Sequence, residues 1–357
     1  MEQALALAAR GLYTTTPNPR VGSVVVKDGA VVGAGWHEKA GLPHAEINAL
    51  REAGESARGA TLYVNLEPCS HHGRTPPCVD AVIAAGVRRV VTAMRDPNPD
   101  VAGAGFARLR AAGIEVEQGV MEEDARELNI GFVSRMTRGR PWVRMKIAAS
   151  LDGRTALANG KSQWITGEAA RRDGHHWRAR ACAVLTGAGT VNEDDPQLNV
   201  REVQTPRQPL KVLIDSRLEI RPEARLFESG KVLVVAARED EVKAKALRAR
   251  GAEVILVPNP EGKTELMSVM RELGRRGVNE LHVEAGTRLN GSLVREGCVD
   301  ELLVYLAPSV IGDSGRGMFA LPELTELEPR TRLSFREVVK IGEDLRIIAR
   351  IAMPIPP

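Results

Sequence analysis

The sequence predicts a two-domain α/β protein, and three observations lead to that fold class. The chain has 357 residues and a mass of 38.6 kDa, which suits two domains that can each bury a core. Apolar, strand-like runs alternate with amphipathic helical patterns along both halves. The alternation is interrupted near residues 137–141, where Gly139 ends a helical pattern and Pro141 starts an extended one. We therefore expect one domain over 1–141 and another over 142–357.

The first half opens with a short amphipathic helix over 4–9 and two strand-like runs, 21–27 and 31–36, which Asp28-Gly29 joins. An Asp-Gly pair between two β-rich runs indicates a tight hairpin. The remaining patterns alternate, with helices expected over 44–53, 78–85, 106–112 and 122–136 and strands over 61–66, 87–93 and 114–117. A hairpin followed by βα units predicts a mixed sheet with helices on both faces, an α/β/α domain.

The second half repeats the alternation and ends in a proline-rich stretch, 354–357, which predicts a disordered terminus. Helical patterns lie between several of the strands and include 240–250 and 266–275. The expected strands are 143–149, 183–186, 210–215, 232–236, 253–257, 281–284, 301–307 and 345–351.

Two of these strands run into glycine-containing turns, Thr186-Gly-Ala-Gly-Thr190 and Val283-Glu-Ala-Gly-Thr287. A strand followed by such a turn lets backbone N–H groups approach a pyrophosphate. The third glycine of the full dinucleotide fingerprint is absent, so for either turn alone the simpler interpretation is a tight turn without a ligand. Two such turns in one domain favour a nucleotide cofactor.

Composition excludes several classes of protein. No stretch approaches the roughly 18 uninterrupted apolar residues of a membrane helix, and the N-terminus shows no signal-peptide pattern. Only 3% of residues are aromatic, and residues 1–143 carry 16 basic and 16 acidic side chains. We therefore expect neither a membrane nor a nucleic-acid partner. Four cysteines are too few for a disulfide framework, which favours metal ligands or core thiols in a cytoplasmic protein.

Three residues of the first half have the chemistry of a zinc site, namely His44, Cys69 and Cys78. One histidine and two cysteines leave the fourth position of a catalytic zinc open for water. Water bound there ionises near neutral pH and can attack an amidine-like carbon. Glu46, two residues after His44, is placed to carry the proton from that water to departing ammonia.

The spacing of these residues limits where they can lie. Residues i and i+2 do not face one another in a regular helix. His44 and Glu46 can therefore act together only at a helix entrance, a position that Pro43 favours. Pro76-Pro77 likewise places Cys78 at the start of the next helix, where a thiolate is stabilised.

Simpler interpretations stand beside the zinc site. A His-x-Glu triplet is common, and two cysteines separated by eight residues are more often ordinary side chains than ligands. His71 and His72 lie between the cysteines and could compete as ligands, although a polar loop facing substrate or solvent is the simpler interpretation. His37 is most simply a loop histidine.

These motifs resemble those of a known family. His44-Ala-Glu46 followed by Pro68-Cys69 is similar to the cytidine-deaminase-like zinc deaminases, in which two residues rather than eight separate the cysteines. Thr15-Thr-Pro-Asn-Pro-Arg-Val-Gly22, the string from Leu66 to Cys78, and Arg95-Asp-Pro-Asn-Pro99 resemble the bifunctional deaminase–reductases of riboflavin biosynthesis. This resemblance continues over nearly the whole chain.

For the first half, the resemblance implies a cytidine-deaminase-like fold in which His44, Cys69 and Cys78 hold one Zn²⁺ and Glu46 moves the proton. The implied substrate is a diaminopyrimidinone ribosylamine 5′-phosphate that loses its 2-amino group as ammonia. Asn18 and the loop 70–74 are candidates to contact the base or the phosphate.

For the second half, Ser150-Leu-Asp-Gly-Arg154, Ser162-Gln-Trp-Ile-Thr166, Asp194-Asp-Pro196 and Glu284-Ala-Gly286 resemble the reductase part of the same family. The resemblance implies a dihydrofolate-reductase-like α/β fold that uses NADPH to reduce the ribosyl chain to a ribityl chain. The residues implied in NADPH binding are Ala148, Trp164, Thr190, Asp194, Ser216, Gly286, Thr287, Arg288, Leu289, Asn290, Gly291 and Ser292.

The residues implied in substrate binding are Ser162, Arg178, Leu198, Arg201 and Glu284. The two arginines suit a 5′-phosphate, because a guanidinium offers paired donors to its oxygens. Taken singly, each arginine could be a solvated surface residue, and Trp164 could be a core aromatic.

Three functions therefore fit the sequence. The leading one is a bifunctional enzyme for a small-molecule substrate, which we expect to be a homo-oligomer because enzymes of this kind are often symmetric. A nucleic-acid base deaminase would share the zinc residues but would need a basic, aromatic-lined groove. A structural-zinc binding protein would need four protein ligands and would leave Glu46 without a role.

Overall fold

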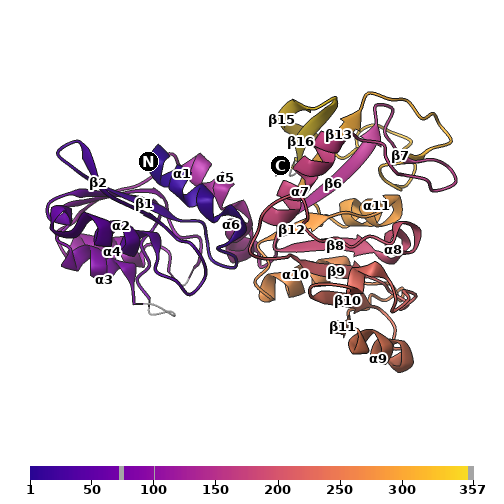
Figure 1. Ribbon diagram of the computed structural model, residues 1–357, viewed down its shortest axis with the longest axis horizontal. Helices are drawn as coiled ribbons and strands as arrows, with labels where there is room; N and C mark the ends of the chain where they lie inside the picture. Colours follow the sequence, from indigo (N-terminus) through magenta and orange to yellow (C-terminus); the bar gives the residue numbers. More distant parts are fainter. Residues whose placement is uncertain (72–75, 100, 353–357) are drawn as a thin grey trace. The chain divides into compact units, whose positions relative to one another are not determined.

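The computed structural model describes residues 1–71, 76–99 and 101–352, and the chain divides into two compact units, Met1–Arg140 and Pro141–Pro357 (Figure 1). The end at 354–357, for which the sequence predicts disorder, lies outside the described residues. Within the described part of the chain, no helix has the length and apolar character needed to cross a membrane.

The first unit is built on a five-stranded sheet in the order β2-β1-β3-β4-β5. β1 runs antiparallel to β2 and β3, whereas β3, β4 and β5 are parallel. The predicted hairpin is present, and Asp28 and Gly29 have φ of 49° and 78°, the left-handed conformations of a tight two-residue turn. The strands are β1 (Gly22–Lys27), β2 (Ala30–Trp36), β3 (Thr61–Leu66), β4 (Arg89–Met94) and β5 (Glu115–Glu117).

Helices cover both faces of this sheet, as the sequence predicts. One face carries α1 (Glu2–Ala9) and α5 (Glu122–Leu128), and the other carries α2 (Ala45–Ala53), α3 (Cys78–Ala84) and α4 (Ala104–Ala111) (Figure 1). α2 lies very close to β2, because a Cβ added at Gly33 would come within 2.2 Å of the Ala49 carbonyl oxygen. This contact seats the helix that begins at the His44–Glu46 motif.

One helix prediction is wrong. The sequence suggests a single helix over 122–136, but the chain forms α5 and then α6 (Ile130–Arg138), with a break at Asn129. The buried Asn129 side chain accepts a hydrogen bond from Arg20 N at 2.8 Å and donates one to Arg20 O at 2.9 Å. Its backbone, with φ of −107°, leaves the helical region so that these bonds to the segment before β1 can form.

The second unit is built on a nine-stranded sheet in the order β11-β10-β9-β8-β12-β6-β13-β16-β15. All neighbours from β11 to β13 are parallel, whereas β16 and β15 extend the sheet as an antiparallel hairpin. A separate ladder joins β7 (Arg154–Ala156) to β14 (Arg316–Gly317). The sheet strands are β6 (Trp142–Ser150), β8 (Ala183–Gly187), β9 (Leu210–Ile214), β10 (Val232–Ala236), β11 (Ala252–Leu256), β12 (Glu280–Val283), β13 (Glu301–Ala307), β15 (Leu333–Ile341) and β16 (Asp344–Ile351).

Each strand that the sequence predicts in this unit has an observed counterpart, but β7, β14 and β15 and the helices α7 and α8 were not predicted. The helices are α7 (Glu168–Arg180), α8 (Ala188–Asp194), α9 (Glu241–Ala249), α10 (Leu266–Arg275) and α11 (Thr287–Arg295). α7 buries only Ala170, His175 and Ala179. It therefore lacks the apolar stripe by which an amphipathic helix is usually found.

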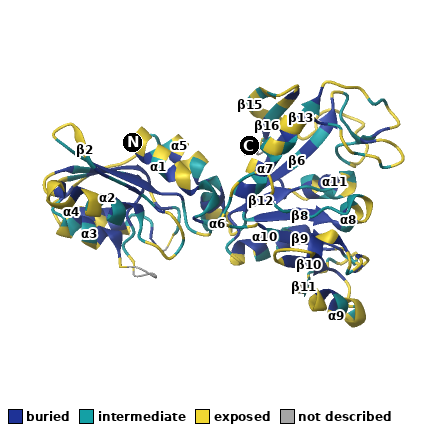
Figure 2. Cartoon of the chain, viewed as in Figure 1, coloured by how far each residue is buried: buried dark blue, intermediate teal, exposed yellow. Residues whose placement is uncertain are grey.

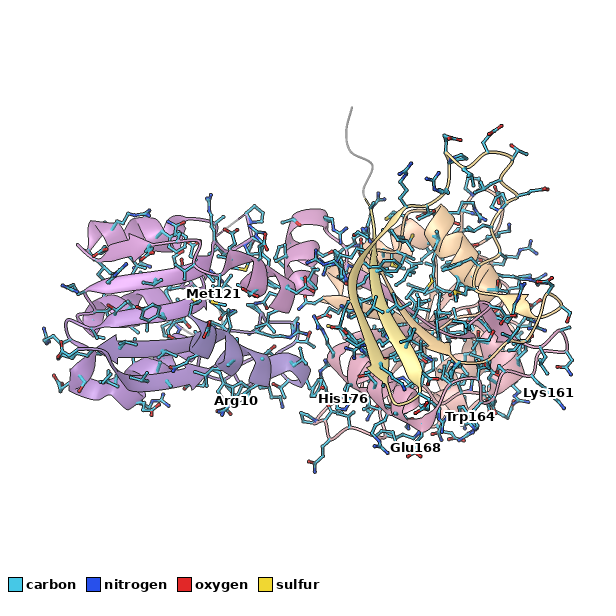
Figure 3. All side chains as sticks on the ribbon, turned by 90° about the horizontal axis from the view of Figure 1, so that it is seen from above. Arg10, Met121, Lys161, Trp164, Glu168 and His176 are labelled. Atoms are coloured by element: carbon cyan, nitrogen blue, oxygen red, sulfur yellow. The ribbon has the colours of Figure 1, made fainter. Side chains whose placement is uncertain are left out.

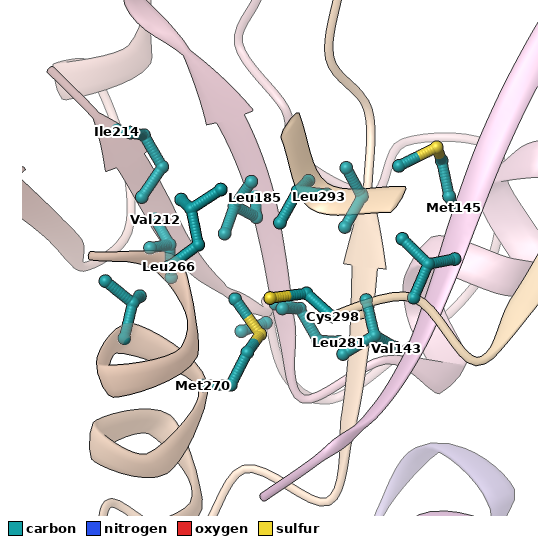
Figure 4. Packing of buried hydrophobic residues seen from close by; sticks show 14 of the residues in the cluster. Val143, Met145, Leu185, Val212, Ile214, Leu266, Met270, Leu281, Leu293 and Cys298 are labelled. Atoms are coloured by element: carbon teal, nitrogen blue, oxygen red, sulfur yellow. The ribbon is translucent and has the colours of Figure 1, made fainter. Parts of the chain in front are cut away.

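The two faces of β6 differ in chemistry. Val143 and Met145 point into an apolar cluster that also contains Leu281 and Met270 and holds Cys298 as a core thiol (Figure 4). Arg144, on the opposite face, lies under α7, where its Cζ is 4.4 Å from the centroid of the Trp177 ring. Figure 2 shows the central strands as buried, whereas much of α9 and β15 is exposed.

Candidate active sites

The first unit contains a cavity of about 430 Å³ near the carboxyl ends of β3 and β4. The side chains that surround it come from the segment before β1, the entrance of α2, the loops after β3 and β4, and α6. They include Asn18, His37, His44, Glu46, Cys69, Asp96, Asn98 and Arg135.

The structure brings the three candidate zinc ligands together beside this cavity. His44 Nδ1 lies 3.2 Å from Cys78 Sγ and 3.6 Å from Cys69 Sγ, and the three ligand atoms lie within 4.8 Å of one another. Hydrogen bonds from Cys78 and from His44 lower the pKa of the Cys69 thiol to about 4, in spite of its burial. This shift favours the thiolate of Cys69, the form of cysteine that binds metals.

The candidate metal ligands lie at helix entrances, as their spacing in the sequence requires. His44 is the N-cap residue of α2, and Glu46 lies in the first turn of that helix. Cys78 is the first residue of α3, directly after Pro77. Both predicted positions at helix entrances are therefore observed.

Glu46 is suited to proton transfer. Its side chain is buried, and this burial, together with the nearby Cys69 thiolate, raises the pKa of the Glu46 carboxyl to about 7. A carboxyl group that titrates near neutral pH can both accept and release a proton during a reaction.

The loop between the two cysteines is described only in part. His71 lines the cavity, as the interpretation of a polar loop facing substrate requires. His72, the other alternative ligand, and Arg74 of the predicted substrate loop lie outside the described residues.

The second unit contains a cavity of about 640 Å³ near the carboxyl ends of β6, β8 and β12. This edge of a parallel sheet is where α/β proteins bind their ligands. The implied NADPH and substrate residues that the structure brings to it are Ala148, Ser162, Trp164, Arg178, Thr190, Asp194, Leu198, Arg201, Glu284, Gly286, Thr287 and Asn290.

Five of the implied NADPH residues do not line this cavity, and they are Ser216, Arg288, Leu289, Gly291 and Ser292. The Ser216 hydroxyl lies 2.9 Å from the Thr264 hydroxyl and accepts a hydrogen bond from Thr264 N. Leu289 packs against the apolar core. A Cβ added at Gly291 would lie 2.1 Å from the Ala320 carbonyl oxygen, so this glycine permits a backbone contact.

Arg178 and Glu284 form a bidentate ion pair in the cavity wall, with distances of 2.7 Å from Nε to Oε1 and 2.9 Å from Nη2 to Oε2. Arg178 Nη1 also donates to the Asn199 carbonyl oxygen at 2.6 Å. Burial alone would raise the pKa of Glu284, but Arg178 and His282 hold it well below its ordinary value. The two residues therefore form a fixed charged pair.

Lys146 stands beside this pair and was missed in the sequence. It lines the cavity, and burial lowers the pKa of its ammonium group, while the Glu284 carboxylate opposes the shift. Arg144 and Lys146 alternate with apolar residues inside a β-run. A charged face at a period of two in an otherwise buried strand was the signal that could have found it.

Two further predicted residues differ in their surroundings. Trp164 is 69% exposed, with the Arg171 Cζ 4.6 Å from its ring centroid, so it is not a core aromatic (Figure 3). The Ser162 hydroxyl donates to the Asp194 carboxylate at 3.2 Å. This hydrogen bond joins one implied substrate residue to one implied cofactor residue.

Comparison with known proteins assigns the chain to a family. The family model of the RibD C-terminal domain matches residues 141–347, and the model of the cytidine and deoxycytidylate deaminase zinc-binding region matches residues 1–94. The riboflavin biosynthesis protein RibD of Escherichia coli K12 is 48% identical, over 97% of this chain and 96% of its own length. The chain belongs to the RibD family.

Solved structures of RibD proteins agree with this assignment. RibD of Acinetobacter baumannii, form 1, superposes with a TM-score of 0.92 at 43% identity and covers 99% of this chain and 98% of its own. A deaminase/reductase from Thermotoga maritima gives a TM-score of 0.86 at 33% identity, over 99% and 97%. As a RibD family member, this chain combines a deaminase domain and a reductase domain, and the fold class expected for each is confirmed.

The residues of this RibD family member fit the groups that the family uses. A nitrogen and two sulfurs form a donor set that zinc prefers, and His44 and Cys69 line the cavity. In the second cavity the N-terminus of α11, at Gly286 and Thr287, lies with Arg225 and Arg316 in the wall. Backbone N–H groups and guanidinium groups suit the phosphates of NADPH.

Sequence reasoning missed three other residues of the first cavity. Asp96 and Asn98 follow β4 in the string that carried part of the resemblance, and burial raises the pKa of the Asp96 carboxyl to about 6. His37, expected to be an ordinary loop histidine, is buried in the cavity wall. A polar residue directly after a predicted strand, near the metal motif, was the available signal.

Proposed function

We propose that residues 1–141 deaminate a diaminopyrimidinone ribosylamine 5′-phosphate, and that residues 142–357 reduce the ribosyl chain of the deaminated product with NADPH. The similarity to full-length deaminase/reductases supports the pairing of the two activities. The observation that carries the proposal is the convergence of His44, Cys69 and Cys78 beside a cavity that also holds the buried carboxyl of Glu46.

In the deaminase, His44 Nδ1 and the two cysteine sulfurs would hold the metal. When bound, zinc supplies Lewis acidity that brings the pKa of water towards neutrality. The Glu46 carboxylate accepts a proton from the attacking water and returns it to the leaving nitrogen, so that water and the amine exchange to give a carbonyl and ammonia. Burial of Glu46 supports this role, since it raises the pKa of the carboxyl to about 7.

In the reductase, the proposed NADPH contacts come from the strand ends and helix entrances that line the second cavity. When bound, NADPH supplies the hydride. Glu284 and Arg178 form the substrate-facing pair, and Arg201 offers a further guanidinium for the phosphate. Lys146 lines the same cavity and interacts electrostatically with Glu284. Asp194 and Ser162 connect the two groups of contacts.

A Glu46→Gln variant tests the deaminase assignment. Purified, zinc-replete protein is given the diaminopyrimidinone ribosylamine phosphate, and ammonia and NADPH are followed together. We expect the native chain to consume NADPH only after ammonia appears. The variant should keep its zinc but lose ammonia release by about 10²-fold to 10⁴-fold, as for removal of a general acid–base group.

The reductase is tested in the same variant with the deaminated product supplied directly. NADPH consumption should then equal that of the native protein. Loss of zinc together with unfolding in Glu46→Gln would favour a structural-zinc protein instead. Ammonia release without NADPH consumption by the native chain would leave only the deaminase.

We further propose that the protein is a homo-oligomer. On one face of the β15–β16 hairpin, Phe335 pairs with Ala349 and Val338 with Ile347, and Phe335 and Val338 are 70% and 53% exposed. An apolar sheet face of this kind usually marks an interface. Light scattering should show a mass that is a multiple of the chain mass, and Phe335→Glu should reduce it to one chain. A native mass of one chain would contradict the proposal.

A cytoplasmic location is also proposed. The four cysteines are free thiols, and Cys69 and Cys78 can hold zinc only while they remain reduced. A reducing compartment preserves such ligands, whereas an oxidising one favours disulfides. Fractionation of the native host should find the protein with cytoplasmic markers, and its recovery with secreted or periplasmic markers would contradict the assignment.

A further inference from the structure

The deaminase cavity contains a buried histidine that the proposed reaction does not use. His37 lies directly after β2 and is only 2% exposed. Both of its ring nitrogens have partners: Nδ1 lies 3.2 Å from the Pro43 carbonyl oxygen, and Nε2 lies 3.0 Å from the Asn18 side-chain nitrogen. His37 thus connects the residue before the metal ligand His44 to a residue of the cavity wall.

The partners determine which nitrogen of His37 carries the proton. A carbonyl oxygen can only accept, so Nδ1 donates to Pro43 O. Asn18 presents its Nδ2 to Nε2, and an amide NH₂ group can only donate, so Nε2 is the acceptor in this contact. In a neutral ring with a protonated Nδ1, Nε2 carries the lone pair and accepts.

This tautomer in turn fixes the amide of Asn18. Nε2 of His37 needs a donor, and only the Nδ2 end of the Asn18 amide can donate. The Asn18 Oδ1 therefore points away from His37. Since Asn18 is part of the cavity wall, the group that the amide leaves for a ligand is its carbonyl oxygen, an acceptor.

We propose that His37 is a positioning residue that sets substrate specificity through Asn18. It holds the Asn18 amide so that Oδ1 accepts a hydrogen bond from an N–H of the pyrimidinone. If a ligand presented an acceptor atom to Asn18 Oδ1, the lone pairs of the two acceptors would face each other without a proton between them. A buried site disfavours such a contact. The inference rests on the proposed deaminase function, because it assumes that the pyrimidinone occupies this cavity.

The tautomer can be tested without activity. In protein labelled with ¹⁵N-histidine, the two ring nitrogens of His37 differ in shift according to which one is protonated, and His37→Gln identifies the signals. We expect Nδ1 to be protonated and Nε2 to be bare in the zinc-loaded, full-length protein. A protonated Nε2 would overturn the proposal, whatever the kinetics show.

Kinetics of ammonia release test the action through Asn18. His37→Phe keeps the size of the ring but removes both nitrogens, and we expect KM to rise by about fivefold to tenfold with kcat within about twofold, as for one neutral hydrogen bond. Zinc content should not change. His37→Gln, which restores one donor and one acceptor, should return KM to within about twofold of the native value.

A double variant separates positioning from mere support of the fold. If His37 acts through Asn18, then His37→Phe should add nothing to KM in an Asn18→Ala background. Equal effects in both backgrounds, or a fall in zinc content or kcat with KM unchanged, would overturn the proposal, since His37 would then only support the Pro43–His44 segment. Native protein that releases no ammonia would instead overturn the proposed function.

Discussion

The Glu67 carboxylate holds the backbone of two segments near the deaminase cavity, and its removal tests how much this contributes to stability. Its side chain is 3% exposed, and its carboxylate accepts four hydrogen bonds from backbone N–H groups. Oε2 accepts from Asp96 N at 3.1 Å and Gly103 N at 2.9 Å. Oε1 accepts from Gly105 N at 2.9 Å and Phe106 N at 3.3 Å. One carboxylate thus holds the start of α4 and the backbone of Asp96.

The change Glu67→Gln keeps the shape but replaces one accepting oxygen with an NH₂ group. Two of the four backbone N–H groups then lose their acceptor, and a buried donor without a partner costs about 1–3 kcal/mol. The variant should therefore lose about 2–6 kcal/mol of local stability. The missing negative charge at the N-terminus of α4 adds about 0.3–1 kcal/mol.

Hydrogen exchange read by mass spectrometry measures this loss where it occurs. Since about 1.4 kcal/mol corresponds to a factor of ten, exchange in peptides covering residues 101–111 should become at least about 25-fold faster. Peptides of the second unit should be unaffected. Glu115→Gln is the matched control, because Glu115 is an exposed carboxylate on β5 whose Oε1 lies 3.4 Å from Arg89 Nε. The local stability measured by exchange in Glu115→Gln should differ from that of the native protein by less than about 0.5 kcal/mol. Exchange within threefold of native in Glu67→Gln would refute the reasoning.

Three further predictions test other parts of the structure. Chelation of zinc, or Cys78→Ser, should stop ammonia release while NADPH oxidation on the deaminated product continues, which parallel assays would show. Gly33→Ala should lower thermal stability by about 1–3 kcal/mol, because the new Cβ would lie 2.2 Å from the Ala49 carbonyl oxygen, whereas Gly174→Ala, with nothing within 4 Å, should be neutral or stabilising. Burial lowers the pKa of Lys211 to about 8, so the folded protein holds fewer protons than the unfolded chain between about pH 8 and 10.5. Denaturant unfolding should therefore show native stability rising with pH in that window relative to Lys211→Met, and a fall would contradict the assignment.

Local patterns singled out the candidate zinc ligands and placed them at helix entrances, whereas their joint role was implied by the resemblance. The spacing of His44 and Glu46 requires a helix entrance, and Pro77 before Cys78 requires another. Both constraints act within a few residues, so no knowledge of the tertiary structure was needed. The break at Asn129 could not be predicted in this way, because its cause is a pair of hydrogen bonds to Arg20, which is 109 positions away in the sequence.

The reductase cavity depended more on resemblance, because its residues come from strand ends that are distant in the sequence. Gly286 and Thr287 were recognisable from a glycine turn after a strand, and they line the cavity. Ser216 was carried over from the resemblance alone, and its hydroxyl faces Thr264 rather than the cavity. The strand order, in which β12 lies between β8 and β6, explains why the turns after β8 and β12 meet at the same edge of the sheet.

Charged side chains on the face of the sheet that α7 covers explain why this helix could not be predicted from the sequence. Arg144 is paired with Glu280 and Glu301, all three almost fully buried, and its guanidinium stacks on Trp177 of α7. Such pairs lose hydration and are weak stabilisers compared with apolar packing. Side chains on one face of a strand recur every two positions. Lys146 therefore shares the face of β6 that carries Arg144, and Glu284, just after β12, continues the face that carries Glu280. The charged face of the sheet that α7 covers is therefore continuous with the candidate reductase cavity. A helix that packs on such a face does not need the apolar stripe that would mark it in the sequence.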